Sequence, residues 1–111
     1  MNKFPLFINM EDNVPTGYEK IELQGKLDYN AGPNDIVAGA NDNSIYLHFN
    51  QSFGNVGVSI YNPSGILVYN NVVDTSIQQT VIIPISSVAI GTYTVVLDNA
   101  NGLVEGDFER N

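Results

Sequence analysis

The sequence predicts an all-β fold, an antiparallel sandwich of about seven strands, and three observations predict it. β-Branched and aromatic residues dominate the 111-residue chain, which contains 12 Val and 11 Ile. Apolar and polar side chains alternate with a period of two along several short segments, as they do in strands that bury one face. Turn residues separate these segments about every ten residues, and no segment has the period of an amphipathic helix.

The first expected strand covers residues 18–24, with Ile21 and Leu23 inward and the charged residues between and before them outward. The segment Asp28–Asn43 follows and is rich in Gly, Asn and Asp. Such residues are typical of turns, so we interpret this segment as a long connection. Within it, residues 36–38 are a candidate for one short edge strand.

The later strands have the same alternation, and a last strand spans about residues 103–108. Inward side chains are expected at Ile45, Leu47, Phe49, Val56, Val58, Ile60, Val81, Ile83, Ile85, Tyr93, Val95 and Leu97. The residues between them are expected on outer faces, among them Tyr46, His48, Tyr61, Val68, Ile82 and Val96.

A hairpin is predicted around Asn62-Pro63-Ser64-Gly65, which has the residue pattern of a type I turn. It joins the strand at 56–61 to one at 66–70. If Tyr61 and Ile66 close the turn, Tyr69 lies opposite Val58 and points inward.

A second turn is expected at residues 98–102, because the Asn101-Gly102 pair tolerates positive φ. Residues 86–91 are interpreted as a short helical turn or loop between the sheets. The chain length suits one domain. We expect that domain at residues 17–111, preceded by a flexible arm at 1–16 that contains Pro5 and Pro15.

The charge balance excludes several classes of partner. Twelve acidic and four basic residues give a net charge of −8, which disfavours nucleic acid and anionic membranes. No run approaches the roughly 18 apolar residues of a membrane-spanning helix, so no membrane insertion is expected. The chain has no Cys, which excludes disulfides and thiolate chemistry. Most acids are expected in the arm, in the Asp28–Asn43 loop and at the C-terminal end, around nearly uncharged sheets.

From residue 18 onward the chain resembles a known family. The segments that carry the resemblance are Lys20-Ile-Glu-Leu-Gln-Gly25, Ser44-Ile-Tyr-Leu-His-Phe49, Asn55-Val-Gly-Val-Ser-Ile-Tyr61, Ser64-Gly-Ile-Leu-Val-Tyr69, Ile90-Gly-Thr-Tyr-Thr-Val95 and Gly102-Leu-Val-Glu-Gly-Asp-Phe108. Together they look like a family of small secreted proteins of Bacteroides-type gut bacteria, a family of unknown function with an immunoglobulin-like sandwich. The latter half is also similar to C-terminal sorting domains of secreted cargo in such bacteria.

The resemblance implies an immunoglobulin-like β-sandwich and a secreted, periplasmic or cell-surface location, and it brings no catalytic residue. Residues 1–10 do not work as a secretory signal, because Pro5 and Asn9 interrupt the apolar stretch and a cleavage site is lacking. Two alternatives therefore stay open from the residues alone. The chain is cytoplasmic, or its export signal has been removed.

The search for chemistry singles out His48, the only histidine, and Tyr46. Because their neighbours point inward, both are expected on one outer sheet face. His48 has two interpretations there: an ordinary solvent-exposed histidine or a catalytic base. A ligand or partner face around Tyr46 and His48 is the candidate binding site, weighed against ordinary solvent-exposed Tyr. We predict no catalytic residue and no cofactor.

A cation site is the other candidate. Asp28-x-Asn30-x-Gly32-x-Asn34-Asp35 alternates oxygen ligands of the kind that Ca²⁺ prefers, and Asn41-Asp42-Asn43 could add more. The spacing departs from the EF-hand pattern. Asp and Asn are also the ordinary residues of turns, so turn chemistry is the competing interpretation. No metal ligand is assigned.

The function predicted is therefore a non-catalytic interaction or structural module with a protein or glycan partner. A carbohydrate-binding module and a secretion sorting domain are the alternatives. Open strand edges are templates for pairing, and the uncharged hairpin at 56–71 is the candidate for self-association.

Overall fold

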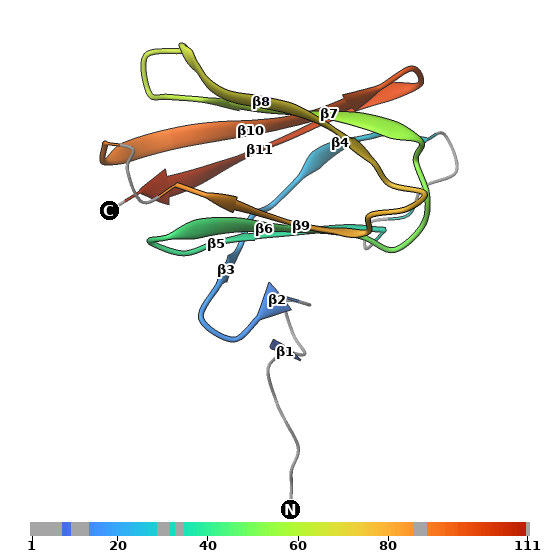
Figure 1. Cartoon of the computed structure of the whole chain (residues 1–111). Coiled ribbons are helices and arrows are strands. Elements are labelled where there is room, and N and C mark those ends of the chain that lie inside the picture. The colour runs from blue at the N-terminus through green and yellow to red at the C-terminus, as the bar shows by residue number, and fades with distance from the viewer. Residues whose placement is uncertain (1–7, 10–13, 29–31, 33–34, 86–88, 111) are drawn as a thin grey trace, which may run out of the picture.

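The computed structural model describes residues 8–9, 14–28, 32, 35–85 and 89–110, which form two antiparallel sheets packed face to face (Figure 1). The first sheet has five strands in the order β4-β11-β10-β7-β8, and the second has four in the order β3-β5-β6-β9. A two-stranded ribbon, β1-β2, precedes them. The strands are β1 Ile8–Asn9, β2 Val14–Pro15, β3 Glu19–Lys20, β4 Gln24–Lys26, β5 Ile36–Ala40, β6 Ser44–Phe49, β7 Asn55–Tyr61, β8 Leu67–Asp74, β9 Thr80–Pro84, β10 Gly91–Asn99 and β11 Gly102–Arg110.

The predicted all-β sandwich is confirmed, but the number of strands is higher than predicted. The two sheets contain nine strands rather than about seven, because short segments on the N-terminal side form strands of their own. None of the described residues lies in a helix, so within them no helix is present that could cross a membrane.

The core lies between the two sheets, where the alternation predicted it. Every predicted inward position in β6, β7, β9 and β10, together with Ile85, is buried. The ring of Tyr93 stacks on Phe108 of β11 at 5.6 Å between centroids, and its hydroxyl donates to the backbone oxygen of Ala89. Residues 86–88 of the predicted loop at 86–91 lie outside the described residues.

The single strand predicted at residues 18–24 is wrong. The chain forms β3, which pairs with β5 in one sheet, and then β4, which pairs with β11 in the other. Ile21 is buried and Leu23 packs against the core at the crossing between the sheets. Alternation identifies the inward residues, but it does not say which sheet each end of the segment joins.

The segment at 36–38 belongs to a longer strand, β5, which is not at the edge along its whole length. β3 covers its C-terminal end, where Glu19 lies opposite Ala40 and Lys20 opposite Gly39. On its other side β5 pairs with β6 over five residue pairs.

The hairpin around Asn62–Gly65 forms as predicted, with the amide of Gly65 donating to the backbone oxygen of Asn62 at 2.9 Å. Its register differs from the prediction, because Tyr69 lies opposite Ile60 instead of Val58. Two shifts of one residue each cause this difference. The turn closes with Tyr61 opposite Leu67 instead of Ile66, and a bulge between Ile60 and Tyr61 leaves Val68 as an extra residue in β8. Tyr69 still packs against the core.

The turn at 98–102 joins β10 to β11, and the Oδ1 of Asn99 accepts the backbone amides of Asn101 and Gly102 at 2.9 Å each. Gly102 is needed here for close approach, since a Cβ on it would collide with the backbone oxygen of Lys26 in β4. The turn is confirmed, with its glycine in the strand rather than in a left-handed conformation.

The expected arm at 1–16 is described only at residues 8–9 and 14–16. There β1 pairs with β2 beneath the four-stranded sheet, on its outer side (Figure 1). Val14 is fully buried, and its Cγ1 lies 3.0 Å from where a Cβ on Gly39 would stand. Gly39 thus leaves the space in which Val14 packs on the sheet.

The acids do not avoid the strands, which corrects the expectation of nearly uncharged sheets. Three of them, Glu105, Asp107 and Glu109, alternate along β11 with the buried residues Val104 and Phe108 and therefore point to the outer face. We call these three the acidic row. The outer face of the five-stranded sheet thus carries much of the negative charge.

Candidate functional site

The outer face of the four-stranded sheet brings the two predicted site residues together. Tyr46 and His48 alternate with buried residues in β6, and their rings are nearly parallel, at 10° and 6.4 Å between centroids. The ring of Tyr18, from the segment before β3, lies 5.7 Å from that of Tyr46. We call these three side chains, Tyr18, Tyr46 and His48, the aromatic row.

Hydrogen bonds hold both ends of the aromatic row. The hydroxyl of Tyr18 lies 2.6 Å from the Oγ of Ser44, which itself donates to the Oδ1 of Asn41. Since the only hydroxyl proton of Ser44 is directed at Asn41, Tyr18 is the donor in its own bond. At the other end, the Nδ1 of His48 lies 2.8 Å from the Oγ1 of Thr80 in β9.

The pKa of Tyr46, at the centre of the aromatic row, is shifted. Burial raises the pKa of the Tyr46 phenol, and the neighbouring Tyr18 raises it further because two phenolates would repel each other. Tyr46 therefore stays protonated as a hydrogen-bond donor at neutral and mildly alkaline pH.

The surroundings of the row are apolar and almost free of charge. Ile82 of β9 lies directly opposite Tyr46 and is 53% exposed, while Val37 of β5 lies opposite His48 and is buried. Lys20 stands opposite Gly39 on the same face. The predicted outward orientation of Ile82 is confirmed, and with it an outer face that is partly apolar.

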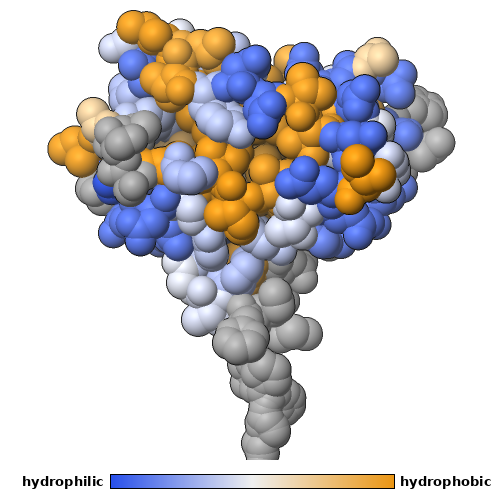
Figure 2. All heavy atoms as spheres, viewed as in Figure 1, coloured by the Kyte–Doolittle hydropathy of each residue, from blue (hydrophilic) through white to orange (hydrophobic). Residues whose placement is uncertain are grey.

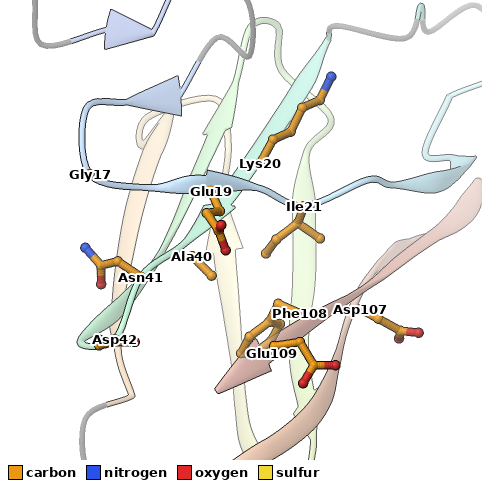
Figure 3. Close-up of a pocket in the computed structure, with 10 residues that line it drawn as sticks. All are labelled: Gly17, Glu19, Lys20, Ile21, Ala40, Asn41, Asp42, Asp107, Phe108 and Glu109. Carbon is orange, nitrogen blue, oxygen red and sulfur yellow. The ribbon is translucent and has the colours of Figure 1, made fainter. Parts of the chain in front are cut away.

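A second concave feature lies at one end of the sandwich, between β3, the β5–β6 turn and the end of β11 (Figure 3). This cleft has a volume of about 510 Å³. Its lining residues include apolar Ile21, Ala40 and Phe108 and acidic Glu19, Asp42, Asp107 and Glu109. Asp107 and Glu109 direct their carboxylates to the outer face of the five-stranded sheet. Figure 3 shows Glu19 and Ile21 turned toward the cleft and Lys20 turned away from it.

The carboxylates of Asp42, Asp107 and Glu109 have partners on the protein. Thr94 donates to Asp107 at 2.8 Å, Thr92 donates to Glu109, and Asp42 lies 4.0 Å from the guanidinium of Arg110. In the described part of the chain no three His, Cys, Asp or Glu side chains are grouped closely enough to hold a metal ion. Among the cleft residues, sequence reasoning considered only Asn41 and Asp42, as possible additional ligands of the cation site in the Asp28–Asn43 loop.

The cation prediction at Asp28–Asn43 falls partly outside the described residues, which lack Asn30 and Asn34. Where the loop is described, its side chains make turn contacts. The carboxylate of Asp35 accepts the backbone amide of Gly32 at 2.7 Å, and the Oδ1 of Asn41 accepts that of Asn43 at 2.8 Å. These contacts favour the turn interpretation for that part.

Tyr18 is the member of the aromatic row that sequence reasoning missed. It is the first residue of the strand expected at 18–24, and its contacts are with β6, 26 residues away from it in the case of Ser44. The available signal was the Tyr immediately after Gly17, a glycine with positive φ that turns the chain back toward the sheet.

Comparisons with known proteins agree with this architecture. Residues 20–110 match the model of a family described as a domain of unknown function, DUF3244. The chain belongs to this family. The family model covers both sheets from β3 onward, including Tyr46 and His48.

One solved structure of a DUF3244 family protein, from Bacteroides vulgatus, is described as having an immunoglobulin-like β-sandwich fold. The chain is 19% identical to it in sequence with a TM-score of 0.75, over 85% of this chain and 99% of that one. The predicted immunoglobulin-like fold and the predicted family are confirmed by these matches. None of the curated proteins matches the chain.

Proposed function

We propose that this domain is a non-catalytic interaction module that acts outside the cytoplasm and binds its partner through the aromatic row. The observation that carries the proposal is three rings in sequence on one sheet face, with exposed Ile82 beside them. Aromatic rings with polar tips are the side chains that interfaces favour, because they bury a large area and still satisfy a hydrogen bond.

The charge distribution supports the choice of this face. In a chain of net charge −8, the described part of this surface carries Lys20 and no carboxylate among the strand residues around Tyr46. A neutral, partly apolar partner would lose little hydration of charged groups on docking there.

A glycan is the second candidate partner, favoured by the geometry of Tyr46 and His48. Their nearly parallel rings are flanked by the hydroxyls of Tyr18, Ser44 and Thr80. Sugar recognition combines apolar contact on a ring with hydroxyl hydrogen bonds, and both elements occur here.

Glycan arrays and affinity capture from the source organism's envelope fraction test the binding proposal. We expect binding that Tyr46→Ala weakens at least tenfold. Tyr61→Ala is the matched control, because Tyr61 points outward on the other sheet. Equal loss in both variants, or binding unchanged by Tyr46→Ala, would contradict the assignment of the aromatic row.

The non-catalytic part of the proposal has a separate test. On a panel of esters, phosphates and glycosides, we expect no turnover above a buffer blank. Turnover that His48→Ala abolishes would overturn it, because His48 is the only imidazole in the chain.

The location outside the cytoplasm is supported by the resemblance to a family of secreted proteins. Expressing the gene with its native upstream region and fractionating the cells tests it, and a protein retained in the cytoplasm would contradict it. Fusing residues 18–111 behind a reporter separates the sorting alternative, which requires export of the reporter.

A further inference from the structure

The outer face of the four-stranded sheet has a gap beside the aromatic row. Lys20, Gly39, Tyr46 and Ile82 are neighbours across this sheet, one on each strand. Gly39 has no side chain, so the sequence of outward side chains is interrupted between Lys20 and Tyr46. We call this gap the Gly39 seat.

Two side chains from the segment before β3 fill the Gly39 seat. The Cγ1 of Val14 and the Cβ of Tyr18 lie 3.0 and 3.2 Å from where a Cβ on Gly39 would stand. Val14 is the only buried residue among residues 14–20, and it is not part of the core between the sheets. Figure 2 shows little hydrophobic surface where this segment meets the four-stranded sheet, in contrast to the hydrophobic band between β8 and β9.

A tight turn connects Val14 to Tyr18. The amide of Tyr18 donates to the backbone oxygen of Pro15 at 3.1 Å, and Gly17 has a positive φ of 95°. Positive φ at the third of four residues is typical of a type II turn, which fixes the direction of the chain on both sides of it. A displacement of Val14 from the seat therefore displaces the Cβ of Tyr18 as well.

The ring of Tyr18 is held at two points. Its Cβ rests in the Gly39 seat, and its hydroxyl donates to the Oγ of Ser44 at 2.6 Å. Between these points the ring lies 5.7 Å from that of Tyr46. Water replaces a lost hydrogen bond at small net cost, whereas it does not replace apolar packing. The packing in the seat is therefore the stronger of the two restraints.

We propose that Val14 is a positioning residue of the aromatic row: by filling the Gly39 seat it holds the ring of Tyr18 beside Tyr46, so that the β1–β2 ribbon is part of the binding surface. This inference rests on the proposed function, since it takes the aromatic row to be the binding site. A partner that contacts Tyr18 stabilises the seated ribbon, and the seated ribbon raises the affinity for that partner by the same factor. Release of the ribbon lowers the affinity.

Two substitutions in the full chain test the seat from opposite sides. Val14→Ser removes the apolar side chain that fills the seat, and Gly39→Val fills the seat from the sheet with a residue that suits strands. Val96→Ser and Gly57→Val are the matched controls, because they make the same exchanges on the outer face of the five-stranded sheet.

Two NMR measurements on the rings need no partner. In the wild type we expect a nuclear Overhauser contact between the rings of Tyr18 and Tyr46, and a pKa of Tyr46 above its ordinary value. Val14→Ser and Gly39→Val should each lose the contact and lower that pKa, because the burial of Tyr46 and its repulsion by Tyr18 both decrease. The controls should change neither. Unchanged ring signals in either seat variant that folds, or equal losses in the controls, would overturn the proposal.

Binding to array glycans or to the captured envelope partner separates this inference from the proposed function. We expect Val14→Ser to weaken binding about tenfold, a usual cost of losing one aromatic anchor, and Val96→Ser to leave it unchanged. Binding that Tyr46→Ala weakens and Val14→Ser does not would overturn the positioning role and leave the proposed function intact. Loss of the ring contact in Val14→Ser, with no binding by the wild type, would support the positioning role and contradict the proposed function.

Discussion

The two outer faces of this sandwich differ far more than the two inner faces do. Both inner faces are made of Val, Ile, Leu and aromatic side chains in simple alternation. The outer face of the four-stranded sheet carries the aromatic row and the buried Val14, whereas the outer face of the five-stranded sheet carries the acidic row. The inner faces of the two sheets therefore pack through the same kinds of side chain. The outer faces differ, so they offer different side chains to a partner.

The difference also affects stability. On the four-stranded sheet an additional segment packs on the outside, so a substitution there removes buried contacts. On the five-stranded sheet the outward side chains of β11 are exposed, and Thr92 and Thr94 hold two of its carboxylates by hydrogen bonds. Substitutions on that face therefore act mainly through electrostatics, which is weak in water.

The largest expected difference between the faces comes from paired Val→Ala substitutions. Val14→Ala removes fully buried methyl groups, and we expect the free energy of unfolding to fall by about 2 kcal/mol. Val96→Ala, at a partly buried position on the outer face of β10, should cost less, about 0.5 kcal/mol. Urea denaturation of both variants measures the contrast. Equal losses would show that Val14 is not held on the sheet.

Gly39 and Gly57, which lie on the outer faces of the two sheets, allow the same comparison of the faces. Gly39→Ala brings a methyl group against Val14 and Tyr18, at 3.0 and 3.2 Å, and should cost about 1 kcal/mol through overpacking. Gly57→Ala, on the other face, meets only the carboxylate of exposed Asp98, which can rotate away. Its effect should stay within about 0.5 kcal/mol. Thermal denaturation of both variants in one buffer measures the two losses of stability. A larger loss for Gly57→Ala would contradict the expectation that the outer face of the four-stranded sheet is the more tightly packed one.

Alkaline pH should weaken the aromatic face selectively. Because the pKa of Tyr46 is raised in the folded state, the unfolded chain loses this proton first as the pH rises above about 10. The folded state then binds more protons than the unfolded state, so the free energy of unfolding falls with rising pH. Tyr46→Phe should reduce this fall. Urea denaturation at several pH values from about 9 to 11 measures it, and identical slopes in wild type and variant would contradict the shift.

The smallest expected effect belongs to the acidic row. Glu105 and Asp107 point to the same face two residues apart, about 7 Å along the strand, and repel each other. Glu105→Gln should therefore raise the free energy of unfolding by a few tenths of a kcal/mol at low ionic strength. The gain should vanish near 1 M salt, where the Debye length is about 3 Å. A gain that persists at high salt would point to packing instead of charge.

Sequence alternation predicted the inward and outward sides of β6, β7, β9 and β10, because a period of two leaves only one apolar set to bury. It placed Tyr46 and His48 on one outer face for the same reason. It did not predict that residues 19–26 divide between two sheets, since Ile21 is inward in either arrangement. The bulge beside Tyr61 and the contact of Tyr18 with Ser44 depend on tertiary packing that no local pattern encodes.

The crossing of the chain from β3 to β4 has a mechanical consequence. β4 is antiparallel to β11, with Gln24 opposite Glu105, so the chain before β4 and the end of β11 leave toward the same end of the sandwich. A force applied between the segment before β4 and the end of β11 loads the β4–β11 hydrogen bonds one after another, so that the two strands separate in the unzipping geometry. We therefore expect the domain to yield to tension at low force from this side, unlike a sandwich whose terminal strands are sheared in parallel.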